Sequence, residues 1–417
     1  METKSIAYVA PYVDEQLHQK RGYSSKHTAG NKKIDCILHA LEEGDNQITV
    51  ISPLLLKKNT FRFFSADRYS IGHRSEVIYP ATVDAKFISL FLTLFTTFFQ
   101  LVRWNRAHKG ESRAVIFYNY RLETALPAML FKMLYRVPLI VEYEDGIYAV
   151  TETNKYYKKL TVMVEKFANK LLDGAVLVTS VLKKRIRTDN YTVVRGGTVH
   201  PAKLKPVQEV NLGTADRAFR MVYSGRLDYD RGIEILLEAL PHVNTERMIQ
   251  LDITGYGPLE EKVKQFIASQ SNARINITFH GFLDDNDYAA LMEQADLFVN
   301  TQREKILFSE CSFPSKVVEY IKYGKLVLTS GVSDINLINQ NMFVTYGNDS
   351  AQELAAAINE ILRHPAQYSL YPARAMQWLI SDCSHKVVAG KLDKVLNRAI
   401  SGGTKEKVVY SESTSMK

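Results

Sequence analysis

Short apolar runs alternate with amphipathic helical patterns along almost the whole chain. Helical patterns in the first half cover residues 31–43, 123–135 and 156–172, and others separate the strands of the second half. The apolar runs that predict strands are 6–10, 48–52, 76–79, 114–118, 138–143, 175–179, 192–194, 219–224, 249–254, 275–280, 297–300, 326–329 and 343–346. Strand–helix alternation predicts parallel sheets covered on both faces. Because it occurs in two successive series, we expect two α/β domains.

The join between the two series is expected at residues 201–216, which contain Pro201 and Pro206 and lack a hydrophobic period. After residue 402 the chain is rich in Ser and Lys, so we expect residues 403–417 to be disordered. Ligands of open parallel sheets bind beyond the carboxyl ends of the strands. Two such domains would therefore place a binding cleft between them.

Length, composition and charge indicate which class of protein this is. A length of 417 residues suits two domains, and 46% hydrophobic with 24% charged residues is typical of a soluble globular chain. The net charge of +8 favours anionic membranes or phosphorylated substrates over nucleic acid, since no nucleic-acid module is recognised. The three cysteines are far apart and predict neither a zinc site nor disulfides, and no signal peptide is evident. We expect a cytoplasmic location.

One segment, residues 87–102, has no charged residue and five phenylalanines. Lys86 precedes it, and Arg103, Trp104 and Arg106 follow it. It is shorter than the roughly 20 residues that cross a bilayer. Two interpretations stay open. It is a buried core helix, or it is an interfacial helix that gives peripheral contact with the inner face of the plasma membrane.

The segment that follows the strand at 219–224 has the features of a diphosphate site. Gly225 allows a sharp turn, and Arg226 and Arg231 carry two guanidinium groups into the start of a helical pattern. A helix start favours an anion, and arginine binds phosphate oxygens in bidentate fashion. The alternative is a strand-to-helix loop with two solvated arginines.

Two further strand ends carry glycines. Gly255 and Gly257 follow the next expected strand, and Pro258 suits a helix start. The strand after it ends at His280, Gly281 and Phe282. The carboxylates that follow at 284, 285 and 287 fit a helix cap better than a metal site.

A third segment combines a cation with an acid. Ser315 suits the first turn of a helix, and Lys316 in that turn opposes the helix dipole unless an anion binds there. Glu319 lies one turn later on the same face and could accept both hydroxyls of a ribose. The alternative is a surface Lys–Glu pair.

Together these motifs resemble the donor domain of glycosyltransferase family 4. The resemblance is carried by Gly225, Arg226, Arg231, Gly255, Gly257, Pro258, His280, Gly281, Phe282, Ser315, Lys316 and Glu319. It implies a GT-B fold, in which two Rossmann-like domains face each other across a cleft. It also implies a nucleotide-sugar donor, no metal or other cofactor, and retention of anomeric configuration. The implied domains are 1–200 for the acceptor, 217–382 for the donor, and a helix at 383–402 that packs back on the first domain.

The chain departs from the family pattern at two places. Cys311 stands where the first glutamate of the family's spaced pair is expected, so Glu310 is a candidate for that role. The family's histidine in the first domain is absent, and Glu144 and Asp145 occupy the corresponding strand end. A carboxylate there could orient or deprotonate an acceptor hydroxyl, or stabilise an oxocarbenium-like centre. Otherwise these acids are a solvated loop.

The sequence therefore predicts a retaining glycosyltransferase that moves a hexose to a hydroxyl, with Arg226, Arg231, Glu144, Asp145 and Glu310 as catalytic candidates. The expected acceptor is a glycan or lipid-linked intermediate of bacterial surface polysaccharide synthesis. Two alternatives stay open. One is a nucleotide-sugar epimerase of the same fold, and the other is a catalytically silent partner of an active transferase.

Overall fold

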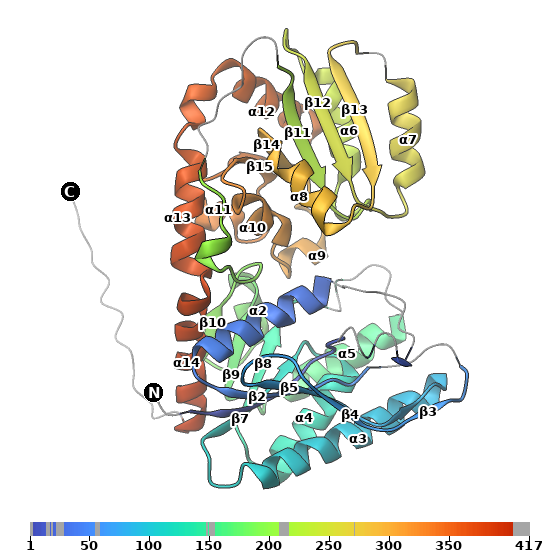
Figure 1. Cartoon of the computed structure of the whole chain (residues 1–417), viewed down its shortest axis with the longest axis vertical. Helices are drawn as coiled ribbons and strands as arrows, with labels where there is room; N and C mark the ends of the chain where they lie inside the picture. Colours follow the sequence, from blue (N-terminus) through green and yellow to red (C-terminus); the bar gives the residue numbers. More distant parts are fainter. Residues whose placement is uncertain are drawn as a thin grey trace, which may run out of the picture.

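The chain forms two α/β domains, one above the other in Figure 1. The computed structural model describes residues 3–13, 17, 20–21, 29–54, 59–146, 149, 155–207, 217–270 and 272–402. Every strand expected from the sequence forms, with ends shifted by at most two residues. Of the expected linker, only residues 201–207 are described, and the expected disordered tail at 403–417 lies outside the described residues.

The N-terminal domain is built on an eight-stranded sheet with the order β10-β9-β8-β7-β1-β2-β5-β4. All its neighbours are parallel except β4 and β5. Its strands are β1 (Ser5–Val9), β2 (Gln47–Ile51), β4 (Asp67–Ser70), β5 (Ser75–Tyr79), β7 (Arg113–Tyr118), β8 (Leu139–Tyr143), β9 (Gly174–Leu177) and β10 (Tyr191–Val193). A separate antiparallel pair joins β3 (Phe63–Phe64) and β6 (Thr82–Val83). The sequence did not predict β3, β4 and β6, because they are short and largely polar or exposed.

Helices cover both faces of this sheet. On one face, α2 (Ala29–Glu43) and α14 (His385–Ile400) pack against side chains such as Ile6 and Ile48. On the other face lie α3 (Lys86–Ala107), α4 (Leu122–Tyr135) and α5 (Lys155–Ala168). Because α14 belongs to the end of the chain, the C-terminal segment crosses from the second domain onto the first through α13 (Tyr371–Cys383).

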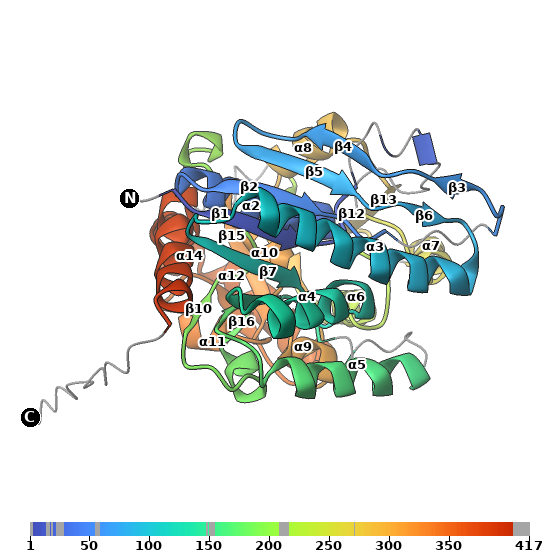
Figure 2. The ribbon, with the colours of Figure 1, turned by 90° about the horizontal axis from the view of Figure 1, so that it is seen from below.

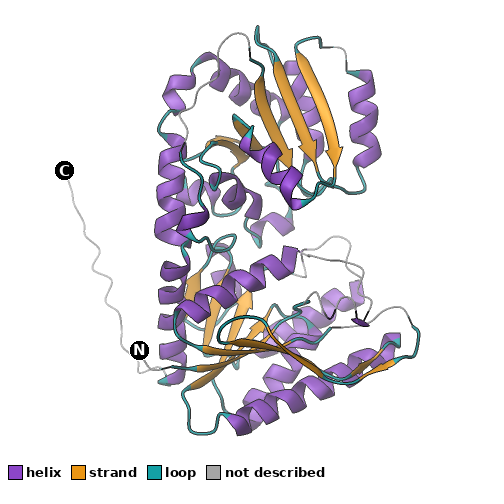
Figure 3. Ribbon diagram, in the orientation of Figure 1, coloured by secondary structure: helices purple, strands orange, loops and turns teal. Residues whose placement is uncertain are grey.

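The C-terminal domain contains a fully parallel six-stranded sheet with the order β13-β12-β11-β14-β15-β16. Its strands are β11 (Phe219–Ser224), β12 (Ile249–Thr254), β13 (Ile275–Gly281), β14 (Leu297–Asn300), β15 (Leu326–Ser330) and β16 (Val344–Tyr346). Its helices are α6 (Ile233–Ala239), α7 (Glu260–Ser269), α8 (Asp285–Glu293), α9 (Leu307–Glu310), α10 (Ser315–Ile321), α11 (Ile335–Ile338) and α12 (Ala351–Arg363), and Figure 3 shows them around the strands. The strand order reverses between β11 and β14, and this switch point is where such sheets bind ligands.

The glycines that end these strands allow the loops to stack. The amide of Gly225 donates to the carbonyl of Thr254 (3.1 Å), and the amide of Gly255 donates to the carbonyl of Gly281 (2.8 Å). Gly255 has φ +142°, and a Cβ on it would lie 1.8 Å from the carbonyl oxygen of Gly225. The loops after β11, β12 and β13 can therefore approach only if residue 255 has no side chain.

We expect Gly255→Ala to lower the free energy of unfolding by about 3 kcal/mol or more, because backbone strain and a clash add together. Gly281→Ala is the matched control. Gly281 also has positive φ (+65°), but a Cβ there meets nothing within 4 Å. It should cost only the strain, about 1–2 kcal/mol. Urea unfolding of both variants measures the difference, and equal losses would show that the close approach is unimportant.

Candidate functional site

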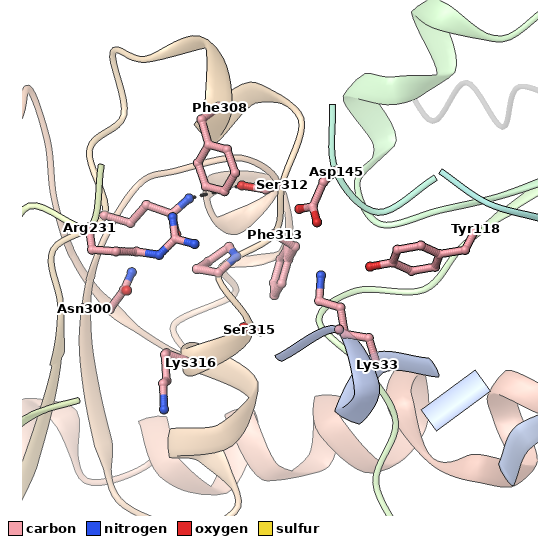
Figure 4. A pocket seen from close by; sticks show the side chains of 13 residues that line it. Lys33, Tyr118, Asp145, Arg231, Asn300, Phe308, Ser312, Phe313, Ser315 and Lys316 are labelled. Carbon is pink, nitrogen blue, oxygen red and sulfur yellow. Dashed lines mark hydrogen bonds between the residues drawn. The ribbon is translucent and has the colours of Figure 1, made fainter. Parts of the chain in front are cut away.

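A pocket of about 140 Å³ lies between the two domains, at the carboxyl ends of strands from both sheets. Its walls come from distant parts of the sequence (Figure 4). The lining residues are Gly30, Lys33, Tyr118, Asp145, Arg231, Asn300, Gln302, Phe308, Ser312, Phe313, Pro314, Ser315 and Lys316. One cation and one acid from the first domain thus face two cations from the second.

Arg231 forms part of the wall contributed by the C-terminal domain. Its guanidinium carbon lies 4.6 Å from the centre of the Phe308 ring, within range of a cation–π interaction. Its amide donates to Asp228 Oδ1 (2.9 Å), and its carbonyl accepts from Thr301 Oγ1 (3.0 Å). These bonds join the loops that follow β11 and β14. Arg231 is therefore held at the switch point of the sheet.

Lys316 and Glu319 form an ion pair in the first turns of α10. Lys316 Nζ lies 2.9 Å from Glu319 Oε2, and it also reaches Ser224 Oγ (3.1 Å) and Tyr288 Oη (3.2 Å). Burial alone would raise the pKa of Glu319, but the charge of Lys316 and its hydrogen bond hold that pKa below its ordinary value. Glu319 is therefore an ionised acceptor. In Figure 4 the Lys316 side chain points away from Arg231.

The opposite wall combines Asp145, at the end of β8, with Lys33 and Tyr118. The Glu144 carboxylate pairs with Lys33 Nζ, and in Figure 4 the Lys33 ammonium lies between Asp145 and Tyr118. Burial alone would lower the pKa of Lys33, but the carboxylates of Glu144 and Asp145 raise it above its ordinary value. Lys33 is therefore a fixed cation beside the Asp145 carboxylate.

The backbone of this wall is held by Asn119. Its side-chain oxygen accepts from the amides of Glu144 (2.8 Å) and Asp145 (3.0 Å). Asn119 has φ +52°, a conformation that asparagine tolerates better than most residues. The bonds fix the turn at the end of β8 and with it the position of the Asp145 side chain.

Glu142, on β8, is a further acidic residue behind this wall. Glu142 is buried and accepts a hydrogen bond from the Tyr8 hydroxyl. Burial and the neighbouring charge of Glu144 raise the pKa of Glu142 well above its ordinary value. Burial also raises the pKa of Glu144, although Lys33 opposes that change. Both glutamates are thus buried close to Lys33, which opposes the effect of burial on their pKa values.

The predicted site residues divide into two sets. The structure brings Asp145, Arg231, Ser315 and Lys316 together as pocket walls, and Glu144 lies directly behind Lys33. Arg226 is not a wall residue. Its side chain is 45% exposed, and its Nε lies 2.8 Å from Asp228 Oδ2. Glu310, at the end of α9, is exposed and also lies outside the wall.

The residues predicted at the ends of β12 and β13 also lie outside this pocket. His280 Nε2 lies 2.8 Å from Asp252 Oδ1, so the ring points toward the neighbouring strand β12. Phe282 is 77% exposed, and its ring packs edge-on against Tyr256, with the ring centres 5.8 Å apart. Gly257 and Pro258 lie in the turn between β12 and α7. At this edge of the sheet, Tyr256 and Phe282 are exposed at the surface.

Cys311, at the position expected for a glutamate, does not face the pocket. It is buried, and its Sγ approaches the carbonyl oxygens of Phe308 (3.3 Å) and Leu307 (3.5 Å). Ser312 and Phe313 line the pocket instead. The residues of this loop that line the pocket are therefore one and two positions later than the position expected for the glutamate.

Several pocket residues were not recognised from the sequence. Tyr118, Lys33, Asn300, Gln302 and Phe308 were not predicted to be ligands. One signal, the position at a strand end, could have found two of them. Tyr118 and Asn300 are the last residues of their strands, where ligands are expected in parallel sheets. For Lys33 and Phe308 only the tertiary structure shows the proximity.

Comparison with known proteins is consistent with this geometry. Residues 218–364, most of the C-terminal domain, match the family described as Glycosyl transferases group 1. The chain is 28% identical over 89 residues to an uncharacterized glycosyltransferase, MJ1607, of Methanocaldococcus jannaschii, covering 21% of this chain and 23% of that protein. It is 27% identical over 172 residues to glycogen synthase of Mycobacterium tuberculosis, covering 40% of each. The matches thus span less than half the length of these relatives.

Solved structures resemble the chain over nearly its full length. Sucrose-phosphate synthase from Thermosynechococcus elongatus has a TM-score of 0.67 at 16% identity, covering 96% of this chain and 100% of that one. HepE from Anabaena in complex with UDP has a TM-score of 0.63 at 14% identity, with 95% and 100% covered. The catalytic domain of starch synthase IV from Arabidopsis thaliana, bound to ADP and acarbose, has 0.64 at 10% identity, with 96% and 100% covered. The expected GT-B fold is confirmed.

Proposed function

We propose that this protein is a glycosyltransferase that moves a sugar from a nucleotide-diphosphate donor to a hydroxyl group of an acceptor. The observation that carries the proposal is the pocket between the domains, with Arg231 on one wall and Asp145 beside Lys33 on the other. Cations face the side where a diphosphate would leave, and acids face the side where a hydroxyl would attack. The group 1 match over residues 218–364 supports the donor assignment.

The donor is proposed to lie along the edge of the C-terminal sheet. Arg231, with Arg226 as its neighbour in the loop, would neutralise the charge that builds on the leaving diphosphate. Glu319 is ionised and would accept hydrogen bonds from the ribose hydroxyls. The exposed ring pair of Tyr256 and Phe282 offers an apolar platform for the base. Gly225, Gly255, Gly257, Pro258, His280 and Gly281 would shape this edge.

The acceptor is proposed to enter from the N-terminal domain. Asp145, held by Asn119, can orient an acceptor hydroxyl and stabilise positive charge on the sugar in transit. Lys33 pairs with the neighbouring Glu144 and places a positive charge beside Asp145 on this wall. We propose retention of configuration, and a glycan or lipid-linked acceptor of surface polysaccharide synthesis.

We also propose that the reaction needs no metal ion. Within the described ranges, no group of three or more His, Cys, Asp and Glu side chains is arranged to hold one. The guanidinium of Arg231 would supply positive charge where a metal would otherwise stabilise the diphosphate. A turnover assay with a nucleotide-sugar and a hydroxyl acceptor would distinguish an active transferase from the silent-partner alternative. The same assay on a Glu310 variant would show whether Glu310 takes part in the reaction.

A thermal-shift panel of UDP-, ADP- and GDP-sugars in EDTA tests the donor assignment. A ligand that binds only the folded protein at 100 times its Kd adds about 2.7 kcal/mol of stability, so at least one nucleotide should raise Tm measurably. Arg231→Ala should reduce that shift. Absence of any shift would contradict the donor proposal. A shift that needs manganese would contradict metal independence alone, and turnover without an acceptor would favour the epimerase.

A further inference from the structure

Helix α3 has apolar side chains on its outer side as well as on its inner side, where Leu101, Val102 and Trp104 are buried. Its hydroxyl side chains at Ser89, Thr93 and Thr97 are buried to 1% exposure or less. Thr82 Oγ1 of β6 satisfies two of them, at 3.3 Å from Ser89 Oγ and 3.0 Å from Thr93 Oγ1. The opposite side of the helix exposes Ile88, Phe91, Phe95 and Phe99, with exposed fractions of 57, 73, 61 and 48%. A surface helix normally turns its apolar stripe toward the core.

The two neighbouring helices continue this exposed apolar surface. On α5 the exposed side chains Tyr156, Leu160, Met163 and Phe167 recur at helical spacing, and on α4 they are Leu130, Met133 and Leu134. Helices α3, α4 and α5 contact one another in that order and lie side by side in the view from below (Figure 2). We call these exposed residues of the three helices the α3–α5 apolar face. Contiguous apolar patches of this kind mark sites of contact with another protein or a membrane.

The charges of the three helices are almost all positive. Their sequences contain only two carboxylates, Glu123 and Glu165. Both are buried and bridged, Glu123 to Arg121 Nε (2.6 Å) and Glu165 to Arg185 Nε (2.7 Å). The exposed basic side chains on these helices are Arg103, Arg106, Lys155, Lys159 and Lys166. The face therefore has an apolar centre and a basic border, without an exposed acid to repel an anionic surface.

We propose that the α3–α5 apolar face docks on an anionic phospholipid bilayer. None of the helices in the described ranges is long and apolar enough to cross a membrane, so the helices lie in the plane of the interface. The basic border attracts anionic headgroups, while the phenylalanines enter the acyl region. A second copy of the chain fits less well, because two such faces would bring their basic borders together. The proposal goes beyond the glycosyltransferase assignment and does not depend on it.

Flotation of the full chain with phosphatidylcholine vesicles, with and without phosphatidylglycerol, tests this docking. The wild-type protein should float with the phosphatidylglycerol vesicles and much less with pure phosphatidylcholine. A triple variant, Phe91→Ser, Phe95→Ser and Phe99→Ser, should lose about tenfold or more of the vesicle-bound fraction. The matched control, Leu337→Ser with Leu370→Ser, removes exposed apolar side chains of the C-terminal domain (67 and 59% exposed) and should float like wild type.

A charge variant separates the electrostatic attraction to anionic headgroups from the insertion of apolar side chains. Lys159→Glu with Lys166→Glu should abolish most of the preference for phosphatidylglycerol, by about tenfold, since each basic residue near the surface contributes to it. A cooperative thermal unfolding transition without ligand checks that every variant is folded, and its shift with nucleotide reports on the donor site separately. Equal flotation of wild type and the triple variant would overturn the proposal. So would a wild-type dimer in light scattering that becomes monomeric in the triple variant and ignores vesicles.

Discussion

Replacing Arg231 by alanine is expected to lower turnover by about two orders of magnitude or more, the scale of losing one preorganised electrostatic donor. Arg231 lines the pocket, and its backbone is anchored on both sides by Asp228 and Thr301. Its position is set before a substrate arrives, so the charge is available in the transition state without reorganisation. Steady-state release of nucleoside diphosphate measures the effect, which should fall mainly on kcat.

Two further arginine variants make this prediction specific. Arg303→Ala is the matched control. Arg303 also lies over an aromatic ring, 4.0 Å from the centre of Tyr229, but it is not a pocket wall. It should keep near-normal turnover. Arg226→Ala should also lose turnover if Arg226 leaves Asp228 to bind the donor. Near-normal kcat in Arg231→Ala would remove Arg231 from the mechanism.

Replacing Asp334 by alanine is expected to cost about 3–5 kcal/mol of unfolding free energy, because it removes one partner of a buried ion pair. Asp334, at the start of α11, is 1% exposed and joins the two domains. It accepts from Thr179 Oγ1 (2.8 Å), Ser180 Oγ (2.7 Å), Ser180 N (2.9 Å) and Arg195 Nε (2.8 Å). Urea unfolding measures the loss, and small-angle scattering reports any change in domain arrangement.

The control for this prediction is Asp296→Ala. Asp296 accepts from Arg217 Nη2 (2.6 Å) and Arg220 N (2.9 Å) within the C-terminal domain alone. It should lower stability without altering scattering. If both variants scatter like wild type, Asp334 does not set the domain arrangement.

Lowering the pH should remove part of the stabilisation that Asp334 provides. Burial alone would raise the pKa of Asp334, but hydrogen bonds from Ser180 and Thr179 and the charge of Arg195 hold that pKa below its ordinary value. A lowered pKa in the folded state means that this stabilisation is complete above the unfolded value of about 3.9 and disappears as pH falls below it. The stability difference between wild type and Asp334→Ala should therefore shrink in that range.

The sequence was sufficient to predict the fold class and several of the residues that line the pocket. Alternation of strands and helices is a local property, since each element shows its own hydrophobic period, and two series of it predict two parallel sheets. Chain order also places residues at strand ends, and that was enough to locate Arg231 after β11 and Asp145 after β8. Ser315 and Lys316 were predicted from the start of a helix, where α10 begins.

Only the tertiary structure decided which side chains meet. Lys33 lies 111 residues from Glu144 in the chain, and no local pattern encodes their pairing. Arg226 and Arg231 look equivalent in the sequence, but backbone turns direct only Arg231 into the pocket. For residues 87–102 the sequence shows an uncharged segment, and only the structure shows that Ser89 and Thr93 face inward and contact Thr82. Distances between remote residues depend on packing, which a one-dimensional pattern does not contain.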